Sequence, residues 1–132
     1  MPVPDTSVLV PIFDADHPLH EKARAQIGAP VLLHVTGGVL AELTTVLRRR
    51  GNDVGLDGSR IARECLGELE QLRGFRHASP CDGAEVTRVF KAHSSLSYVD
   101  AWGIVLALEL GDTIITFDER QASAFKREKA RQ

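Results

Sequence analysis

The sequence predicts an α/β domain with three layers, in which helices flank a mainly parallel central sheet. Short β-branched or aliphatic runs alternate with longer segments of helical periodicity along the 132 residues. Strands that alternate with helices in this way are typical of parallel sheets. No internal repeat, low-complexity segment or linker divides the chain, so residues 1–132 are expected to form one domain.

In the first half of the chain, start and stop signals bound the expected elements. Prolines limit the first strand, while Asp16 and Gly28 mark the two ends of the first helix. An apolar stripe at helical spacing follows Gly37-Gly38, and this second helix is expected to stop at Gly51. The expected elements are strand 2–6, helix 16–27, strand 31–35, a helix to about residue 50, and helix 59–73 with Ile61, Cys65, Leu69 and Leu72 facing inward.

The second half of the chain begins with a brief strand at 75–78. Asp82 and Glu85 then form a capping pattern that starts a helix with Val86, Val89 and Phe90 on its packed face. Residues 97–110 are apolar nearly all round, which predicts a buried central helix. The last expected elements are strand 113–117 and a charged helix that begins near residue 119.

Composition and charge narrow the possible classes of protein. The hydrophobic content of 43% and the charged content of 26% are ordinary for a soluble globular protein. No segment approaches a membrane span and no signal-peptide pattern begins the chain, so we expect a cytoplasmic protein without membrane association. Cys65 and Cys81 form no metal-binding or disulfide pattern and are expected to be plain thiols.

Basic residues are segregated, although the net charge of −2 does not itself indicate nucleic-acid binding. Local basic patches can guide a phosphate backbone even on a slightly acidic protein. Solvated helix ends and a charged tail explain either patch equally well, so both interpretations stay open. The two clusters are Arg48-Arg49-Arg50, and Lys126-Arg127 with Lys129 and Arg131.

Four acidic residues interrupt the most apolar parts of the chain: Asp5, Glu42, Asp100 and Asp118. Carboxylates are rarely buried unless they are paired or bind a metal, because desolvating the ionised group costs much free energy. Two of the four end predicted strands, and the other two lie in the first or second turn of a helix. Ligands of parallel α/β sheets bind beyond the carboxyl ends of the strands. All four acids are therefore expected to converge at one edge of the sheet.

Each acid also has a structural explanation. Asp118 followed by Gln121 reads as an N-cap with a capping box, and Ser97 with Asp100 reads as another box. Asp5 is able to cap a turn after the first strand, and Glu42 lies on the flank of its helix. For any single acid the capping or surface interpretation is slightly favoured, whereas the set of four favours a shared pocket.

Such a pocket requires cations, because four carboxylates close together repel one another. Mg²⁺ or Mn²⁺ prefers oxygen ligands and suits a site without His or Cys. The hydroxyls of Thr6, Ser7 and Thr116 are expected to orient the carboxylates or a bound water. No Ser-His-Asp arrangement or phosphate-binding glycine loop is present, and His17 and His20 are expected at the exposed surface.

The segments Asp5-Thr6-Ser7, Leu40-Ala41-Glu42, Ser97-Tyr98-Val99-Asp100-Ala101 and Thr116-Phe117-Asp118 together resemble the PIN domain. The chain is most similar to the VapC-type toxins of bacterial toxin–antitoxin pairs, and the similarity spans essentially its whole length. Three features depart from the family pattern. Pro4 precedes Asp5, Gly37-Gly38 replaces a bulkier helix start, and a charged helix ends the chain where many relatives have a further strand.

This resemblance implies an endoribonuclease in which Asp5, Glu42, Asp100 and Asp118 bind Mg²⁺ or Mn²⁺, with Asp5 and Asp100 as the principal ligands. The expected reaction is hydrolysis of RNA phosphodiester bonds by a metal-activated water. The resemblance also implies a VapB-type antitoxin partner that blocks the site, and a homodimer.

Two rival functions stay open at this point. A phospho-receiver domain also has a Mg²⁺-binding acidic pocket, but it needs an acidic pair after the first strand and a Lys after a late strand. Here Asp5 has no acidic neighbour, and the late strand ends in Asp118. A catalytically idle PIN-like binding module is the other rival, which the presence of all four acids disfavours.

Overall fold

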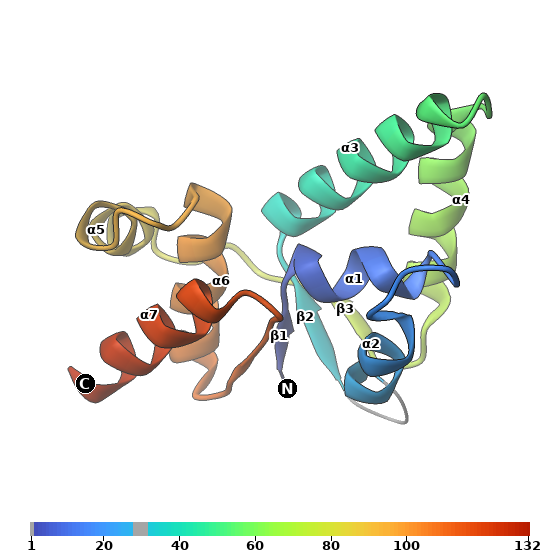
Figure 1. Cartoon of the computed structure of the whole chain (residues 1–132). Coiled ribbons are helices and arrows are strands. Elements are labelled where there is room, and N and C mark those ends of the chain that lie inside the picture. The colour runs from blue at the N-terminus through green and yellow to red at the C-terminus, as the bar shows by residue number, and fades with distance from the viewer. Residues whose placement is uncertain (1, 28–31) are drawn as a thin grey trace.

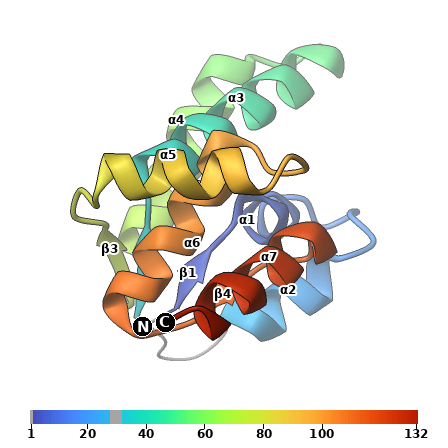
Figure 2. The same cartoon turned by 90° about the vertical axis from the view of Figure 1, so that its left-hand side faces the viewer.

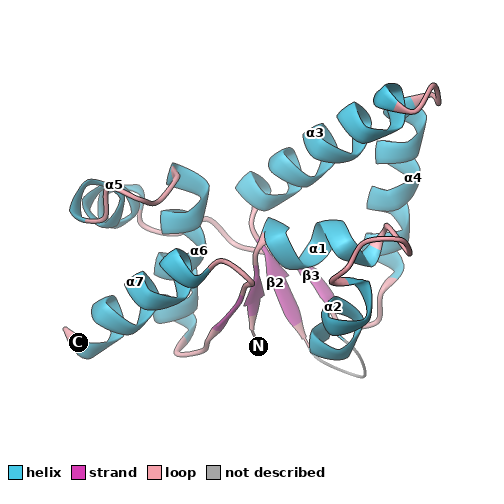
Figure 3. Cartoon of the chain, viewed as in Figure 1, coloured by secondary structure: helices cyan, strands magenta, loops and turns pink. Residues whose placement is uncertain are grey.

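The computed structural model describes residues 2–27 and 32–132, so Gly28 and Val31, which bound two predicted elements, lie outside the described residues. Figure 1 shows the helices arranged around short central strands, and Figure 3 shows that most of the chain is helical. The elements are β1 (Val3–Pro4), α1 (Thr6–Ile12), α2 (His20–Ile27), β2 (Leu33–Val35), α3 (Gly37–Asp53), α4 (Gly58–Gln71), β3 (Phe75–His77), α5 (Gly83–Ala92), α6 (Tyr98–Leu110), β4 (Ile114–Ile115) and α7 (Glu119–Ala130).

The strands in the described ranges form two parallel pairs, β1 with β4 and β2 with β3. The amide of His34 donates to the carbonyl oxygen of Pro2 (3.1 Å), which places the pairs side by side in the order β3-β2-β1-β4. This arrangement confirms the predicted mainly parallel sheet. In the two registers, Val3 lies opposite Ile114 and Leu33 opposite Phe75.

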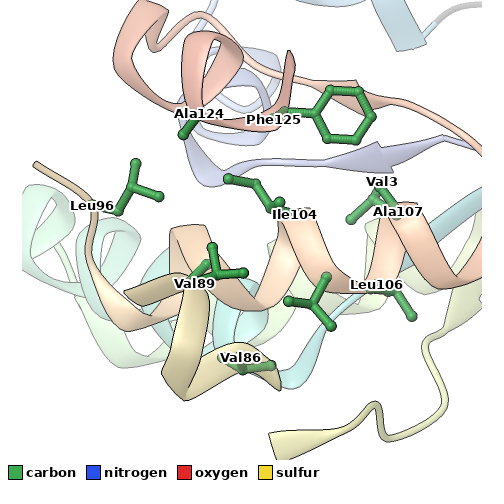
Figure 4. Close-up of a cluster of buried hydrophobic side chains, with 11 residues drawn as sticks. Val3, Val86, Val89, Leu96, Ile104, Leu106, Ala107, Ala124 and Phe125 are labelled. Atoms are coloured by element: carbon green, nitrogen blue, oxygen red, sulfur yellow. The ribbon is translucent and has the colours of Figure 1, made fainter. Parts of the chain in front are cut away.

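Buried apolar side chains form two clusters, one within each group of helices. The first joins β1 to α5, α6 and α7, and Figure 4 shows Ile104 of α6 together with Val3, Val89 and Phe125. The second joins α1, α3 and α4 to β2 and β3 and includes Leu9, Leu33, Leu43 and Leu69. Figure 2 shows α5, α6 and α7 in front of β1. The strands therefore lie between two helical layers, as predicted.

The buried central helix was predicted correctly. α6 carries six buried residues, and Gly111 ends it in the left-handed conformation (φ 65°), which glycine adopts without steric cost. No helix in the described part of the chain has the length and apolar character needed to cross a membrane.

One helix was missed and one helix start was placed too early. The predicted strand 2–6 ends at Pro4, and α1 begins at once, capped by Asp5. The predicted helix 16–27 starts only at His20. Before it, Asp14 Oδ1 accepts from the Asp16 amide (3.1 Å) and His17 Nδ1 accepts from the Leu19 amide (3.0 Å). These side chains compete with the helix for the local amides.

Gly51 does not stop α3, which continues to Asp53. A Cβ atom at Gly51 would come within 2.8 Å of the Cα of Gly58, so this glycine permits close packing of α3 against the start of α4. Two predicted inward positions are also wrong. Leu72 lies just after the end of α4 and is 41% exposed, and Phe90 is 40% exposed and stacks edge-on against Tyr98.

Candidate metal centre

The four predicted acids lie at or near the starts of four helices. Asp5 and Asp118 are the N-cap residues of α1 and α7. Asp100 is in the first turn of α6, and Glu42 is in the second turn of α3. Figure 1 shows α1 and α3 starting where β1 and β2 end. The parallel topology thus gathers acids that lie far apart in the sequence.

Asp5 lies where β1 and β4 end together. Its amide donates to the carbonyl oxygen of Ile115 (2.8 Å) and so continues the pairing of the two strands. The residue is only 6% exposed. Its Oδ2 atom accepts hydrogen bonds from the Ser7 amide and from the Thr116 hydroxyl, both at 3.2 Å. Two donors, from Ser7 and Thr116, therefore hold the carboxylate, and the amide of Asp5 ties its backbone to β4, so the side chain is fixed only when both segments are in place.

Two of the predicted hydroxyls form a chain that ends on Asp5. Ser7 Oγ accepts from the Phe117 amide (3.0 Å) and lies 3.2 Å from Thr116 Oγ1. Because the Thr116 proton points to Asp5, the Ser7 hydroxyl is the donor between the two hydroxyls. Thr116 Oγ1 also accepts from the Asp118 amide (3.0 Å). One hydrogen-bond network therefore connects the Asp5 side chain to the backbone at Asp118.

The third predicted hydroxyl connects α1 to α3. Thr6 donates to Glu42 Oε1 at 2.8 Å, a bond between residues 36 positions apart. Glu42 is half-buried. The sequence placed Glu42 on the flank of its helix, and this hydrogen bond shows that the flank faces the start of α1.

Asp100 has the predicted capping role. Its Oδ2 accepts from the Ser97 amide (3.0 Å), and Ser97 Oγ accepts from the Asp100 amide (3.1 Å). The predicted capping box at the start of α7 is absent among the described contacts, because the Gln121 side chain turns inward and donates to the carbonyl oxygen of Asp100 (3.2 Å). Asp118 alone caps α7, through Oδ1 and the amide of Arg120 (2.9 Å).

Each acid uses only one of its two carboxylate oxygens in these contacts. Asp5 Oδ2, Glu42 Oε1, Asp100 Oδ2 and Asp118 Oδ1 accept the hydrogen bonds described above. Within residues 2–27 and 32–132, the second oxygen of each acid accepts no hydrogen bond from the protein. Capping and metal binding are therefore compatible, since a carboxylate has lone pairs for both.

The carboxylates also affect one another electrostatically. Burial raises the pKa of Glu42, and the charges of Asp5 and Asp100 raise it further against the opposing hydrogen bond from Thr6. Burial likewise raises the pKa of Asp100, with further increases from Asp5 and Asp118 against the hydrogen bonds of its capping box. Ionisation of Glu42 and Asp100 therefore costs more here than in water, and a nearby cation would lower that cost.

The donor set fits hard divalent cations, because carboxylate oxygens with supporting hydroxyls are the ligands that Mg²⁺ and Mn²⁺ prefer. In the ranges that the structure describes, no three His, Cys, Asp or Glu side chains are grouped closely enough to hold an ion among themselves. An ion here would take one or two carboxylates directly and water for its remaining positions. Mg²⁺ commonly binds in this way, since it loses its waters reluctantly.

The structural roles of two neighbouring residues were not predicted from the sequence. Gln121, only 2% exposed, holds the backbone of Asp100 from α7. It shares a helix face with Ala124, Phe125 and Glu128, a spacing that would have indicated an inward position. Trp102 packs against Gly38 at the start of α3, where a Cβ atom would lie 2.9 Å from the indole ring. This contact brings α3 close to α6.

The basic residues, histidines and cysteines that the sequence analysis singled out have contacts within the protein or are buried in part. Arg50 pairs with Asp14 (3.0 Å), and Arg131 reaches Glu128 (3.5 Å). His17 and His20 are half-buried, which corrects their expected exposure, and His20 Nδ1 lies 2.7 Å from the carbonyl oxygen of Pro11. Cys65 and Cys81 are free thiols, and burial raises the pKa of both.

Comparisons with known proteins identify a matching family and a similar solved structure. A family model described as PIN domain matches residues 3–126. A search of curated protein sequences found no match. Among solved structures, the chain is similar to Mycobacterium tuberculosis VapC20, described as a sarcin-ricin loop cleaving toxin. The TM-score is 0.72 at 20% sequence identity, over 94% of this chain and 95% of that chain. At this level of identity, the likeness shows a shared fold.

Proposed function

This chain belongs to the PIN domain family, and on that basis we propose that it is a metal-dependent endoribonuclease, the toxin of a VapBC-type toxin–antitoxin pair. The observation that carries the proposal is the cluster of four acids, each with one carboxylate oxygen that accepts no hydrogen bond from the described residues. Similarity to a VapC toxin supports the toxin assignment. In this proposal the partner is a VapB-type antitoxin, and the protein acts in the cytoplasm as a homodimer.

The proposed ligands of Mg²⁺ or Mn²⁺ are Asp5 and Asp100, with Glu42 and Asp118 completing the site through bound water. When bound, the cations would lower the pKa of a water molecule and neutralise the attacked phosphate. The protein contributes the positions of the ligands. Thr6 holds Glu42, and the pair Ser7–Thr116 holds Asp5, so that little reorganisation is needed when substrate binds.

The test is RNA cleavage by protein freed of antitoxin. Because the sarcin-ricin loop is the substrate named for VapC20, an RNA hairpin with this loop is the first substrate, followed by other structured RNAs. Cleavage should require Mn²⁺ or Mg²⁺, stop with EDTA, and fall by at least about 100-fold in Asp5→Asn and Asp100→Asn, the scale of loss when a key electrostatic group is removed.

Asp57→Asn is the matched control, because Asp57 caps α4 through the Arg60 amide (3.2 Å) in the way that Asp118 caps α7, but lies outside the acidic cluster. This variant should cleave like the wild type. Cleavage that persists in both Asp5→Asn and Asp100→Asn would contradict the proposed centre. A wild type that binds Mn²⁺ but cleaves no RNA would support a binding module in place of an enzyme.

A further inference from the structure

Three shallow depressions follow one another from the acids along α3, and neighbouring depressions share lining residues; we refer to the three together as the groove. The middle depression, of about 460 Å³, contains Thr6 and Glu42. It shares Thr6 and Val46 with a depression of about 390 Å³ that reaches Asp118. On the opposite side it shares Thr45 with a depression of about 320 Å³ between α3 and α4. The groove therefore runs from the acids along α3 to the α3–α4 junction.

Two arginines line the α3–α4 end of this groove, Arg48 from α3 and Arg63 from α4. Among the residues that the structure describes, neither forms an ion pair with a carboxylate. Their neighbours behave differently, since Arg50 pairs with Asp14 (3.0 Å) and Arg60 with Glu64 (2.9 Å). The groove thus ends at two exposed guanidinium groups whose charge no described acid balances.

The other residues that line the α3–α4 end of the groove are uncharged. Thr44 and Thr45 donate their hydroxyl protons to carbonyl oxygens of their own helix, Leu40 and Ala41, both at 2.8 Å. Arg63 donates to the carbonyl oxygen of Ser59 (3.1 Å) and to its hydroxyl, which fixes the guanidinium at the groove wall. The arginines are therefore the principal donors available to a ligand here, and this end of the groove favours an anionic ligand.

We propose that this end of the groove binds a backbone phosphate of the RNA substrate through Arg48 and Arg63, away from the bond that is cleaved. The inference rests on the proposed nuclease function. The planar guanidinium group, with its paired N–H donors, is well suited to phosphate. Arg48 lies six residues after Glu42, about 9 Å along α3 at the helical rise per residue. A phosphate there belongs to a neighbouring nucleotide of the same strand.

This arrangement separates two tasks along one groove. At the acidic end, where Arg50 is already paired with Asp14, bound cations would supply most of the positive charge that a phosphate needs, whereas at the basic end Arg48 and Arg63 supply it. RNA bound in this way would lie across α1 and α3, and the arginines would set the position of the strand relative to Asp5 and Asp100. They contribute to affinity and position but read no base, because phosphate contacts carry no sequence information.

The test measures RNA binding separately from cleavage. A fluorescein-labelled RNA hairpin is titrated with antitoxin-free protein in EDTA, and fluorescence anisotropy gives the affinity at several salt concentrations. Arg48→Ala and Arg63→Ala should each weaken binding by roughly five- to ten-fold at low salt, and should lower the slope of log K against log[salt] by about 0.7 to 0.9, the value for one lost phosphate contact.

Matched controls lie next to each arginine. Arg49 is adjacent to Arg48 but lines none of the three depressions, and Arg60 is on α4 in a pair with Glu64. Arg49→Ala and Arg60→Ala should change affinity by less than about two-fold, as expected for rim charges without a direct contact. If all four variants bind RNA as tightly as the wild type, the proposal is overturned. It is also overturned if Arg48→Ala and Arg63→Ala lose no more affinity than Arg49→Ala and Arg60→Ala.

Two further outcomes separate this inference from the proposed function. RNA binding that depends on Arg48 and Arg63, in a wild type that cleaves nothing with Mn²⁺, would support the phosphate site and contradict the nuclease. Unchanged RNA affinity combined with weaker retention of the co-expressed antitoxin in Arg48→Ala and Arg63→Ala would assign the groove to a protein partner and overturn the phosphate site.

Discussion

At the scale of single residues, each acid combines a hydrogen-bonding role within the protein with its proposed role as a metal ligand. A sequence-based interpretation treats these two roles as alternatives. Asp5, Asp100 and Asp118 cap helices through one oxygen each, and Glu42 accepts from Thr6 in the same way. The structural role orients the side chain and leaves the other oxygen for a ligand. The capping interpretation was therefore correct for three acids and did not argue against a metal site.

A buried acid outside the cluster gives a prediction about pH. Burial opposes ionisation of Glu128, but hydrogen bonds from Arg88 (2.6 Å) and His93 (2.9 Å) outweigh it and lower the pKa of Glu128 from 4.5 to about 2. Since the folded-state pKa lies below the ordinary value, the ionised carboxylate stabilises the fold above about pH 4.5. This stability is lost as the pH falls through 2.

Glu128→Gln should therefore lower the free energy of unfolding at pH 7 by an amount on the order of 3 kcal/mol, at about 1.4 kcal/mol per pKa unit. Urea denaturation at pH 7 and at about pH 3 checks this. The difference in free energy of unfolding between the wild type and Glu128→Gln should shrink to less than half at the lower pH. Glu119→Gln, an exposed acid on the same helix, is the control. A gap that is equal at both pH values would contradict the assigned ion pairs.

At the scale of elements, the sequence was most informative for long periodic segments. α6 and the apolar stripe of α3 were predicted, because many buried residues at helical spacing define them. α1 was missed, since its seven residues are rich in β-branched types and include Pro11, which favour an extended interpretation. From sequence, Asp5 was expected at most to cap a turn, whereas the structure shows that it is the N-cap of α1.

The glycines of α3 show what sequence alone leaves undetermined. From sequence, Gly37-Gly38 was a departure from the family pattern that could permit close approach of the helix start to the sheet, and the structure shows that its neighbours lie on α6. At Gly38, a Cβ atom would lie 2.9 and 3.1 Å from the Trp102 ring and 3.2 Å from Val99. At Gly37, the nearest ring atom of Trp102 is 3.7 Å away, an ordinary contact. Only Gly38 is required for the close approach of α3 to α6.

Gly38→Ala should move α3 away from α6 and separate Glu42 from Asp100. We expect a loss of about 1–3 kcal/mol in the free energy of unfolding, the usual cost of overpacking, together with at least about ten-fold weaker Mn²⁺ binding, the loss typical of disturbed support around a metal site. Unfolding and calorimetric titration measure the two effects.

The control for this prediction is Gly37→Ala, which should bind Mn²⁺ like the wild type. Trp102 is the single tryptophan of the chain, so its fluorescence reports any change in packing at the mutated helix. Unchanged Mn²⁺ binding in Gly38→Ala, with altered Trp102 fluorescence, would show that the spacing of α3 and α6 does not determine the site.

At the scale of the whole molecule, topology explains why the acids converge. Parallel strands place their carboxyl ends on one side, and the helices that follow them begin there. The order of elements was enough to predict this convergence. The individual partners were not predictable in full, because the hydrogen bond from Gln121 to Asp100 and the contact of Gly38 with Trp102 depend on how helices distant in sequence pack.

The groove along α3 belongs to the same scale, since no short motif encodes it. Arg48 and Arg63 come from different helices and meet only because α3 and α4 form a hairpin, which projects from the rest of the chain in Figure 1. From sequence, the cluster of residues 48–50 had two equally good explanations. The structure separates two of its members, because Arg50 pairs with Asp14 and lines the depression that reaches Asp118, while Arg48 lines the α3–α4 end of the groove with no carboxylate partner among the described residues.

Calorimetric titration with Mn²⁺ tests most directly whether the four acids form one metal site. Wild type and Asp57→Asn, which removes the charge of a helix cap outside the cluster, should bind Mn²⁺ equally. Asp100→Asn should bind at least about ten-fold more weakly, because a ligand charge is lost while an amide oxygen still caps α6. Equal binding by all three proteins, or no Mn²⁺ binding by the wild type, would contradict a metal centre at these acids.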